Sequence, residues 1–296
     1  MTGPWGGGNK TVESLVSLMI KKENIVTFDL KDRDIDVIFC MDPRPNSKGE
    51  WYQNFINYRN ENPRTKIVQR VGDVGTHSKP ELTNLVNQST RISDFNIFPS
   101  TWAKDYISYE KENYAIIPNR PKLEFFNFRK HGNIKEKVRI VTHHWSTNPK
   151  KGFDVYEHIS RNRRDIEFTY IGRLPENIDL ENTKKIEPMN SKELARELPK
   201  HDIYLTASVE EAGANHVLEA MAAGLPVIYH SSGGSIPEYC NGYGIEYSSI
   251  SNLDEKIDAM VSNFKKYKKN VMSYNQKIED TIEEYGRIIC EIQGKY

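Results

Sequence analysis

The sequence predicts an α/β protein with two domains, each built on a mostly parallel sheet. Short apolar segments rich in β-branched and aromatic residues recur along the chain, and helical patterns separate them. The chain has 296 residues, which is enough for two domains of ordinary size with separate cores. A polar stretch over residues 121–137 divides the two series of elements and is the predicted interdomain connection.

The first predicted domain, residues 1–120, opens on a glycine-rich loop at residues 3–9. The next segment, residues 11–22, places Val12, Leu15 and Met19 on one face, the spacing of an amphipathic helix. Further helices are predicted at residues 52–58, 79–87 and 102–109, and strands at residues 25–28, 37–40, 65–71, 95–98 and 114–117. No strand precedes the glycine loop, so this domain is expected to lack its first strand.

The second predicted domain, residues 138–270, continues the alternation. Strands are predicted at residues 138–141, 167–171, 203–207 and 225–229 and near Ile186, and helices at residues 153–160, 191–198 and 215–223. Gly224 is expected to end the helix at 215–223, because glycine adopts positive φ easily, and Pro226 prevents its continuation. The pattern is helical from residue 250, and residues 271–296 contain a terminal helix with one apolar stripe.

Charge, cysteine content and hydropathy limit the class of protein. Lysine plus arginine and aspartate plus glutamate both number 41, so net charge gives no indication of a nucleic-acid partner. The three cysteines are far apart and have no metal-binding spacing, which predicts reduced thiols and a cytoplasmic setting. No segment has the apolar length of a transmembrane helix, and the first 20 residues lack the apolar run of a signal peptide.

The most informative segment is residues 208–238, with the sequence SVEEAGANHVLEAMAAGLPVIYHSSGGSIPE. It lies in a strand–turn–helix–strand unit whose helix begins at the carboxyl edge of a parallel sheet. The first backbone N–H groups of such a helix bind anions, so the amides of Asn215, His216 and Val217 are candidate donors to a pyrophosphate. Glu219 is expected to accept the ribose hydroxyls and Glu211 to face the sugar of a nucleotide sugar.

An ordinary βαβ unit with two solvent-facing glutamates is the alternative explanation. The combination of E-x7-E with EAMAxGxPV and GGxxE favours a functional site. This combination resembles the donor site of glycosyltransferase family 4, of the "group 1" type. The resemblance is strongest over residues 138–244 and looser over residues 3–119.

The resemblance implies a GT-B fold, in which two Rossmann-like domains face a central cleft and a C-terminal helix crosses back to the first domain. It also implies transfer with retention of configuration and no required metal or other cofactor. Glu211 is then the catalytic candidate, with the role of positioning the sugar and stabilising charge.

The resemblance carries further donor-site residues onto this sequence. Lys151 matches the lysine that contacts the diphosphate, whereas the arginine that accompanies it in the family is absent and Trp145 stands in its region. Either Arg173 compensates or the diphosphate clamp is weaker. Gly7 and Gly8 match the glycine loop that approaches the donor phosphates, with a flexible N-terminal tail as the alternative. Met189 lies at the usual base-binding position.

Arg70, Asp73 and His77 follow a first-domain strand and are the candidate acceptor-side residues. Alternatively, Arg70 and Asp73 pair with each other to hold their loop. His143 and His144 are poor joint metal ligands, because adjacent side chains on a strand point to opposite faces. A structural or phosphate-adjacent role is favoured over metal binding for them.

The sequence therefore predicts a retaining, family 4-like glycosyltransferase of glycan biosynthesis. It would move a sugar from a UDP- or GDP-linked donor to a hydroxyl of a sugar, a lipid-linked acceptor or a protein glycan. A lysine cluster at residues 265–269 is interpreted as a solvated helix face, with peripheral membrane contact as the alternative. A GT-B sugar-nucleotide epimerase and a nucleotide-sugar-binding protein without transfer activity are the other functional hypotheses.

Overall fold

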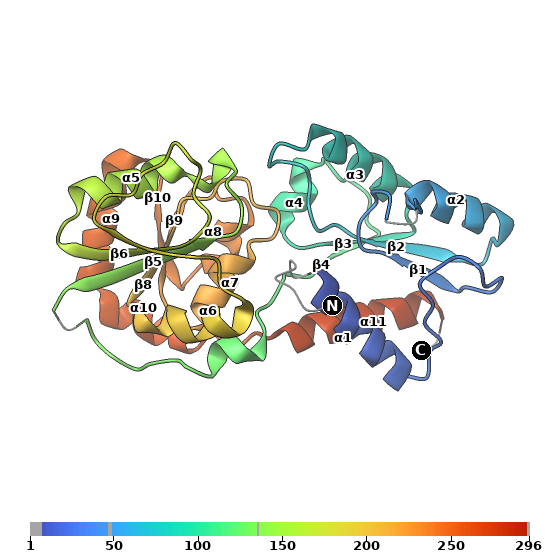
Figure 1. Cartoon of the computed structure of the whole chain (residues 1–296). Coiled ribbons are helices and arrows are strands. Elements are labelled where there is room, and N and C mark those ends of the chain that lie inside the picture. Colours follow the sequence, from blue (N-terminus) through green and yellow to red (C-terminus); the bar gives the residue numbers. More distant parts are fainter. Residues whose placement is uncertain (1–7, 47–48, 135, 295–296) are drawn as a thin grey trace. The chain divides into compact units, whose positions relative to one another are not determined.

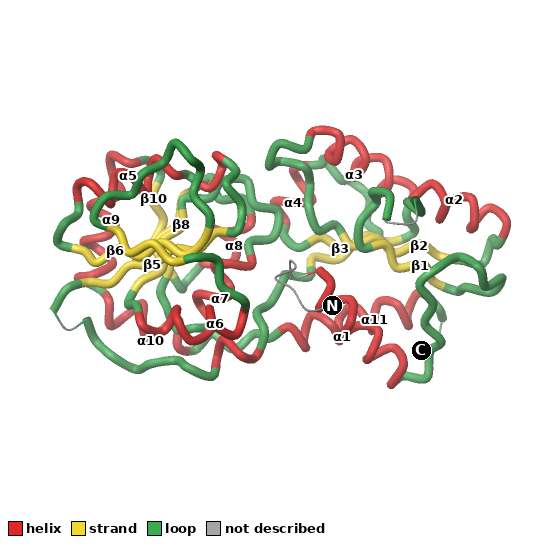
Figure 2. Tube along the Cα trace, in the orientation of Figure 1, coloured by secondary structure: helices red, strands yellow, loops and turns green. Residues whose placement is uncertain are grey.

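The computed structural model describes residues 8–46, 49–134 and 136–294. The chain divides into two compact units, one made of Met1–Asn119 with Ile278–Tyr296 and the other of Arg120–Lys277. Each unit contains one parallel sheet flanked by helices (Figure 1; strands are yellow in Figure 2), which confirms the predicted α/β class. No helix in the described ranges is both long enough and apolar enough to cross a membrane.

The first unit has a four-stranded sheet whose strands are neighbours in chain order. Its strands, all parallel, are β1 (Val37–Cys40), β2 (Lys66–Arg70), β3 (Phe95–Phe98) and β4 (Tyr114–Ile116). Its helices are α1 (Gly8–Lys21), α2 (Tyr52–Glu61), α3 (Pro80–Ile92), α4 (Thr101–Tyr106) and α11 (Ile278–Ile292). The consecutive order places the ends of β1 and β2 side by side.

The terminal helix α11 completes the core of the first unit. Ile282, Tyr285 and Ile289 of α11 are buried with Leu15 and Met19 of α1. The two helices pack together against the sheet, from which Val68 and Ile97 contribute (Figure 1). Helix α11 at the C-terminal end of the chain thus packs in the first unit, as expected from the family resemblance.

One expectation about the chain is corrected. Residues 25–28 form no strand: Ile25 and Phe28 are 98% and 70% exposed, and among the described residues β1 pairs only with β2. A short β-prone segment without a neighbouring strand has no partners for its backbone groups, so propensity alone does not make it a strand.

The stretch predicted as an interdomain connection, residues 121–137, is grouped with the second unit and packs in part within its core. The 3-10 helix η1 (Leu123–Phe126) carries Phe125, which is 1% exposed within that unit's core. Arg129 donates to the carbonyl oxygens of Ala222 and Tyr274 at 2.5 and 2.6 Å. Charged hydrogen bonds to backbone carbonyls are stronger than neutral ones, so this stretch is tightly held.

The second unit has a six-stranded parallel sheet in the order β10-β9-β8-β5-β6-β7. The strands are β5 (Val138–His144), β6 (Ile166–Gly172), β7 (Thr183–Ile186), β8 (Ile203–Thr206), β9 (Val227–His230) and β10 (Gly244–Tyr247). From β5 the chain adds β6 and β7 on one side of the sheet, and from β8 it adds β9 and β10 on the other side. In such doubly wound sheets, ligands bind outside the carboxyl ends of the two central strands, where the order reverses.

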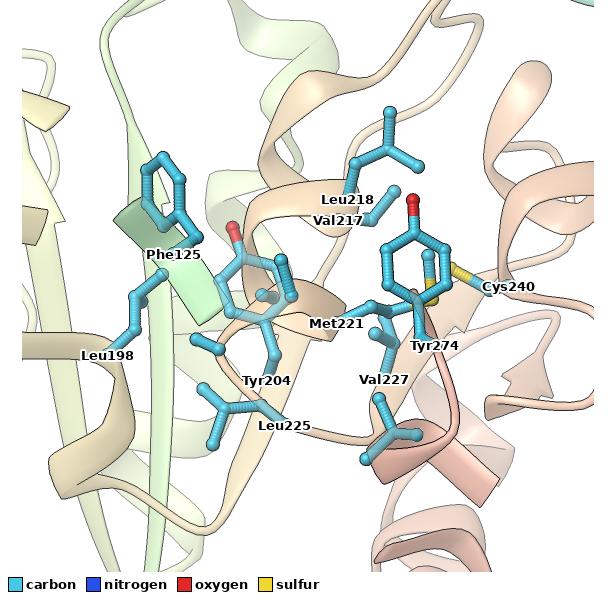
Figure 3. Close-up of a cluster of buried hydrophobic side chains, with 14 of the residues drawn as sticks. Phe125, Leu198, Tyr204, Val217, Leu218, Met221, Leu225, Val227, Cys240 and Tyr274 are labelled. Carbon is cyan, nitrogen blue, oxygen red and sulfur yellow. The ribbon is translucent and has the colours of Figure 1, made fainter. Parts of the chain in front are cut away.

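Helices cover both faces of this sheet. They are α5 (Phe153–Asn162), α6 (Ser191–Glu197), α7 (Asn215–Ala222), α8 (Ser235–Cys240), α9 (Ile250–Ser262) and α10 (Phe264–Met272), with 3-10 turns η2 (Pro149–Lys151) and η3 (Leu198–Lys200). Side chains of α5 and α9 bury one face. Side chains of α6, α7 and α8 bury the other, together with Tyr204, Leu225 and Tyr274 (Figure 3).

Helix α7 ends at Ala222, one residue before the predicted end, and Gly224 follows with positive φ as expected. Gly224 has φ +82° and its amide donates to the Met221 carbonyl oxygen at 2.9 Å. Lys268 donates to the Gly224 carbonyl oxygen at 2.6 Å, and burial lowers its pKa to about 8. The lysine cluster of α10 is therefore not entirely solvated, since Lys268 serves to hold the end of α7.

All three cysteines are unpaired and buried. Burial raises the pKa of the Cys40 thiol to about 12, which makes it a poor nucleophile.

Candidate functional site

Two loops meet at the point where the strand order of the second sheet reverses. One loop follows β5 and carries Lys150 and Lys151, and the other follows β8 and carries Glu211. The Val209 amide donates to the Lys150 carbonyl oxygen at 2.9 Å, which ties the loops together. Gly152 has φ +72°, and a β-carbon there would lie 2.6 Å from the Ala207 carbonyl oxygen. A glycine is therefore required for the loops to approach this closely.

Lys151 and Glu211 are bonded to each other. Lys151 Nζ donates to Glu211 Oε1 at 2.5 Å, and the two side chains are only 12% and 14% exposed. The neighbouring residues form a parallel pair, in which Lys150 donates to Glu210. From the sequence, Lys151 is predicted to contact a diphosphate and Glu211 a sugar. An ammonium group has three donor hydrogens, so Lys151 can bond Glu211 and a phosphate oxygen together.

The backbone of Glu211 is held by the glycine pair of the GGxxE motif. Gly234 forms an isolated parallel bridge with Glu211, and the Ser235 amide donates to the Glu211 carbonyl oxygen at 2.8 Å. Gly234 has φ +72°, and a β-carbon there would lie 2.6 Å from the Glu211 backbone nitrogen. Glu210 has φ +55°, an uncommon conformation for a residue with a side chain. The turn that presents Glu211 is thus specified by contacts from β9 and α8.

The first turn of α7 begins directly beyond β8. Ala214, at the N-cap, provides no side-chain cap, and its own amide donates to Ser235 Oγ at 3.1 Å. Asn215 is exposed, His216 is half-buried and Val217 is completely buried. His216 Nε2 lies 3.0 Å from Thr206 Oγ1. This helix start, next to Lys151, has the geometry and charge of an anion-binding site.

Glu219 contacts a residue that was not among the predicted site residues. His143 Nε2 lies 3.0 Å from Glu219 Oε2, with side-chain exposures of 12% and 25%. The Tyr204 hydroxyl accepts from the His143 amide at 3.2 Å and donates to its carbonyl oxygen at 3.3 Å. His143 Nδ1 is buried and has no hydrogen-bond partner in the described part of the chain. His143 therefore orients the carboxylate of Glu219.

A sequence signal for His143 existed in the alternation of β5. Val141 belongs to the core beneath α7, and residues two apart on a strand share a face, so His143 faces α7 as well. His144 points to the other face, where its Nε2 lies 2.6 Å from the Tyr156 hydroxyl of α5. The ring of His144 also lies 5.3 Å from the ring of His216 in the first turn of α7, measured between centroids. Burial raises the pKa of Tyr156 to about 12, so its hydroxyl stays neutral.

Arg173 is brought next to Trp145. Its guanidinium carbon lies 4.2 Å from the Trp145 ring centroid, a cation–π contact between the ends of β5 and β6. The Arg173 amide also donates to the His144 carbonyl oxygen at 3.3 Å, and Gly172, with φ +133°, permits this close approach. Met189, beyond β7, is partly buried against the core of the same unit. Both predicted residues therefore lie beyond the carboxyl ends of their strands.

The acceptor-side candidates lie in the first unit. Arg70 Nη2 donates to Asn119 Oδ1 at 2.8 Å, whereas Asp73 accepts from Lys79 Nζ at 2.7 Å. The alternative in which Arg70 pairs with Asp73 is thus wrong. Burial acts to raise the pKa of Asp73, but hydrogen bonds from Lys79 and the Gly75 amide hold it below its usual value.

The remaining predicted site residues are His77, Gly7 and Gly8. His77 is half-buried in the loop beyond β2. Gly8 is the first residue of α1, and Gly7 lies outside the described residues. No three histidine, cysteine, aspartate or glutamate side chains in the described ranges are grouped so that they could hold a metal ion.

Residues 143–263 match the protein family described as "Glycosyl transferases group 1". The matched segment contains Lys151, Glu211 and Glu219 and excludes the acceptor-side candidates. No curated protein matches the chain.

Solved glycosyltransferase structures share the fold over nearly the whole chain. HepE of Anabaena, in complex with UDP and glucose, has a TM-score of 0.67 at 12% identity, covering 98% of this chain and 97% of HepE. WaaG, a glycosyltransferase of lipopolysaccharide biosynthesis, has a TM-score of 0.65 at 16% identity, covering 97% of each chain. A glycosyltransferase of Rickettsia africae has a TM-score of 0.67 at 14% identity, covering 100% of this chain and 85% of that one. The chain thus has the GT-B fold of these proteins.

Proposed function

We propose that this protein is a glycosyltransferase that moves a sugar from a nucleotide-sugar donor to an acceptor hydroxyl with retention of configuration. The observation that carries the proposal is the placement of Lys151, Glu211 and the start of α7 together at the strand-order reversal. That position is where doubly wound sheets bind nucleotides. The family match over residues 143–263 and the shared GT-B fold support the same reaction class.

In this proposal the donor diphosphate binds at the first turn of α7. The amides of Asn215, His216 and Val217 donate to its oxygens, and Lys151 supplies a positive charge. Arg173, stacked on Trp145, takes the place of the arginine that is absent from the β5 loop. When the bond between the sugar and the diphosphate breaks, negative charge develops on the departing phosphate oxygen. These cations and helix dipoles therefore stabilise the leaving group.

Glu219 accepts the ribose hydroxyls, and His143 holds its carboxylate in position. Met189 lies beyond β7, where the base is expected to bind through backbone groups. HepE was solved with UDP and glucose, which supports UDP-linked donors as the first to test, with GDP-linked donors next.

Glu211 positions the sugar and stabilises positive charge at its anomeric carbon. In the retaining reaction the bond from the anomeric carbon to phosphate breaks, and the bond to the acceptor oxygen forms on the same face. The acceptor proton passes to the departing phosphate oxygen. No protein nucleophile and no metal is assigned a role in this proposal.

The acceptor is a sugar, a lipid-linked sugar or a protein glycan, and Arg70, Asp73 and His77 are its candidate contacts. Three buried, unpaired thiols support a reducing, cytoplasmic setting for the reaction. If the acceptor is lipid-linked, the exposed lysines of α10 are the candidate contacts with the membrane surface.

The test is incubation of the protein with a panel of nucleotide sugars, chosen after a thermal-shift screen of nucleoside diphosphates. We expect release of free nucleotide together with a glycosylated acceptor. The product's anomeric configuration, measured by NMR coupling constants, should equal that of the donor. An isomerised donor would indicate an epimerase, and binding without turnover would indicate a nucleotide-sugar-binding protein.

A further inference from the structure

A cavity of about 310 Å³ lies in the first unit at the carboxyl ends of β1 and β2. Asp42, Gln69, Arg70 and Asp73 provide its polar lining, and Leu82 and Val86 of α3 provide part of its apolar lining. The volume is at the small end of ligand pockets, about the size for one sugar ring or a comparable group. The position follows the general rule that open parallel sheets bind ligands beyond their carboxyl ends.

Two polar groups of the cavity residues are buried without a partner. Gln69 is 1% exposed, and its Nε2 has no hydrogen-bond partner in the described part of the chain. Its Oε1 accepts from Ser93 Oγ at 3.2 Å, so the side chain is anchored through its oxygen. Arg70 Nε is likewise buried and unpartnered among the described residues. Burying a hydrogen-bond donor without an acceptor costs free energy. A ligand whose oxygens accept from these two groups would recover that cost as binding energy.

The charges around the cavity leave Arg70 uncompensated. Asp42 is paired with Arg44 at 2.5 Å, and Asp73 with Lys79 at 2.7 Å. Arg70 bonds the neutral amide of Asn119 at 2.8 Å and takes part in no ion pair within the described ranges. Both carboxylates of the lining therefore have their own cations, whereas the guanidinium has no anionic partner there.

The guanidinium of Arg70 is also held in place. Asn119 fixes one Nη atom, and the other lies so close to Gly72 that a β-carbon on residue 72 would collide with it. A preorganised guanidinium loses little freedom on binding, and its planar fork matches carboxylate and phosphate oxygens.

We propose that this cavity binds an anionic group, a carboxylate or a phosphate, carried by the sugar acceptor. Arg70 supplies the charge and Gln69 a second donor. The proposal rests on the proposed glycosyltransferase function for the identity of the ligand as acceptor. It assigns the class of that acceptor as an acidic sugar or a sugar phosphate, in preference to a neutral sugar.

The test measures binding of glucuronate, glucose 6-phosphate, inorganic phosphate and glucose to the full chain by calorimetry. We expect at least one of the charged sugars to bind about tenfold tighter than glucose, because a charge-assisted hydrogen bond to Arg70 is stronger than a neutral one. Binding of the phosphate compounds alone would identify phosphate, and binding of glucuronate alone would identify carboxylate. Equal affinity for glucose and both charged sugars would overturn the proposal.

Two variants locate the binding site. Arg70→Gln and Gln69→Glu should each weaken binding of the charged sugar about tenfold, by removing the cation or adding a repelling carboxylate. Arg64→Met removes an exposed cation before β2 and should leave this affinity unchanged. Wild-type affinity in either cavity variant would contradict the assignment, and thermal unfolding confirms that each variant is folded.

The same variants separate this inference from the proposed reaction. Affinity for UDP or GDP should stay within about twofold in Arg70→Gln, because Lys151, Glu219 and the start of α7 lie in the second unit. Arg70-dependent anion binding without sugar transfer from any donor would contradict the proposed reaction and still support the anion site.

Discussion

Gly234 and Glu211 lie backbone to backbone, joined by an isolated parallel bridge, although they belong to separate parts of the sequence motif. A β-carbon on residue 234 would lie 2.6 Å from the Glu211 backbone nitrogen. The glycine pair after β9 and the glutamate after β8 therefore form one structural unit. Residue 234 must be glycine for a steric reason, because a side chain there would collide with the backbone of Glu211. The close approach of the two backbones in turn sets the position of the Glu211 carboxylate.

Gly234→Ala should displace Glu211. We expect turnover to fall at least about tenfold and the free energy of unfolding to fall by about 1–3 kcal/mol. Gly242→Ala is the matched control, because Gly242 also has positive φ, +81°, but a β-carbon added there would meet no described atom within 4 Å. Kinetics and denaturant unfolding of both variants test this prediction. Equal loss of turnover in the two variants would show that backbone strain alone is responsible.

Glu219→Gln should weaken binding of the nucleoside diphosphate without unfolding the protein. Loss of a charge-assisted hydrogen bond costs about 1.5–3 kcal/mol, roughly 10- to 150-fold in Kd. Calorimetric titration with UDP and GDP measures the effect, and Glu255→Gln on the exposed face of α9 is the control. Unchanged affinity in Glu219→Gln would remove this residue from the ribose site.

Lys151→Ala should lower turnover more than it weakens binding of the uncharged nucleoside, because its proposed partner is the diphosphate. Lys150→Ala, which removes the adjacent cation, should have the smaller effect on turnover. Equal loss of affinity for nucleoside and nucleoside diphosphate in Lys151→Ala would point to a folding defect.

Glu211→Ala should reduce transfer by at least about a hundredfold and keep nucleoside diphosphate affinity within a few-fold. A carboxylate that acts on developing charge at the sugar contributes mainly in the transition state. Glu210→Ala, in the same turn, is the control for the backbone conformation. Because Lys151 and Glu211 are in contact, the double variant should cost less than the two single changes added together. Wild-type turnover in Glu211→Ala would exclude it from the active site.

Stability should fall on acidification partly because of His201. This residue is 8% exposed, and burial lowers its pKa below the ordinary value of about 6.5. Below about pH 6.5 the unfolded chain binds a proton at this position that the folded chain resists, so the free energy of unfolding decreases there. Above that pH the residue is neutral in both states and has no such effect. His201→Gln should reduce the pH dependence of the free energy of unfolding between about pH 7.5 and 5.5, measured by denaturant unfolding. An unaltered pH dependence in the variant would contradict this prediction.

Local periodicity was sufficient to predict most of the elements. The strand at residues 95–98 was predicted at its observed bounds, and the predicted helix at 215–223 exceeds α7 by one residue at its C-terminal end. The stop at Gly224 was also predictable, because the positive φ of a helix-ending glycine is a local backbone property. The strand predicted at 25–28 was wrong, because a strand also needs a neighbour and the described part of the fold provides none there.

The sequence by itself determined the α/β class, the residue types of the donor site and the α7 helix that carries Asn215 and Glu219. Only the tertiary structure decided which of these side chains meet. Lys151 and Glu211 are 60 residues apart and His143 and Glu219 are 76 apart, and each pair meets because β5 and β8 are neighbours. Strand order is decided by how whole elements bury their apolar faces against one another, so short-range patterns do not contain it.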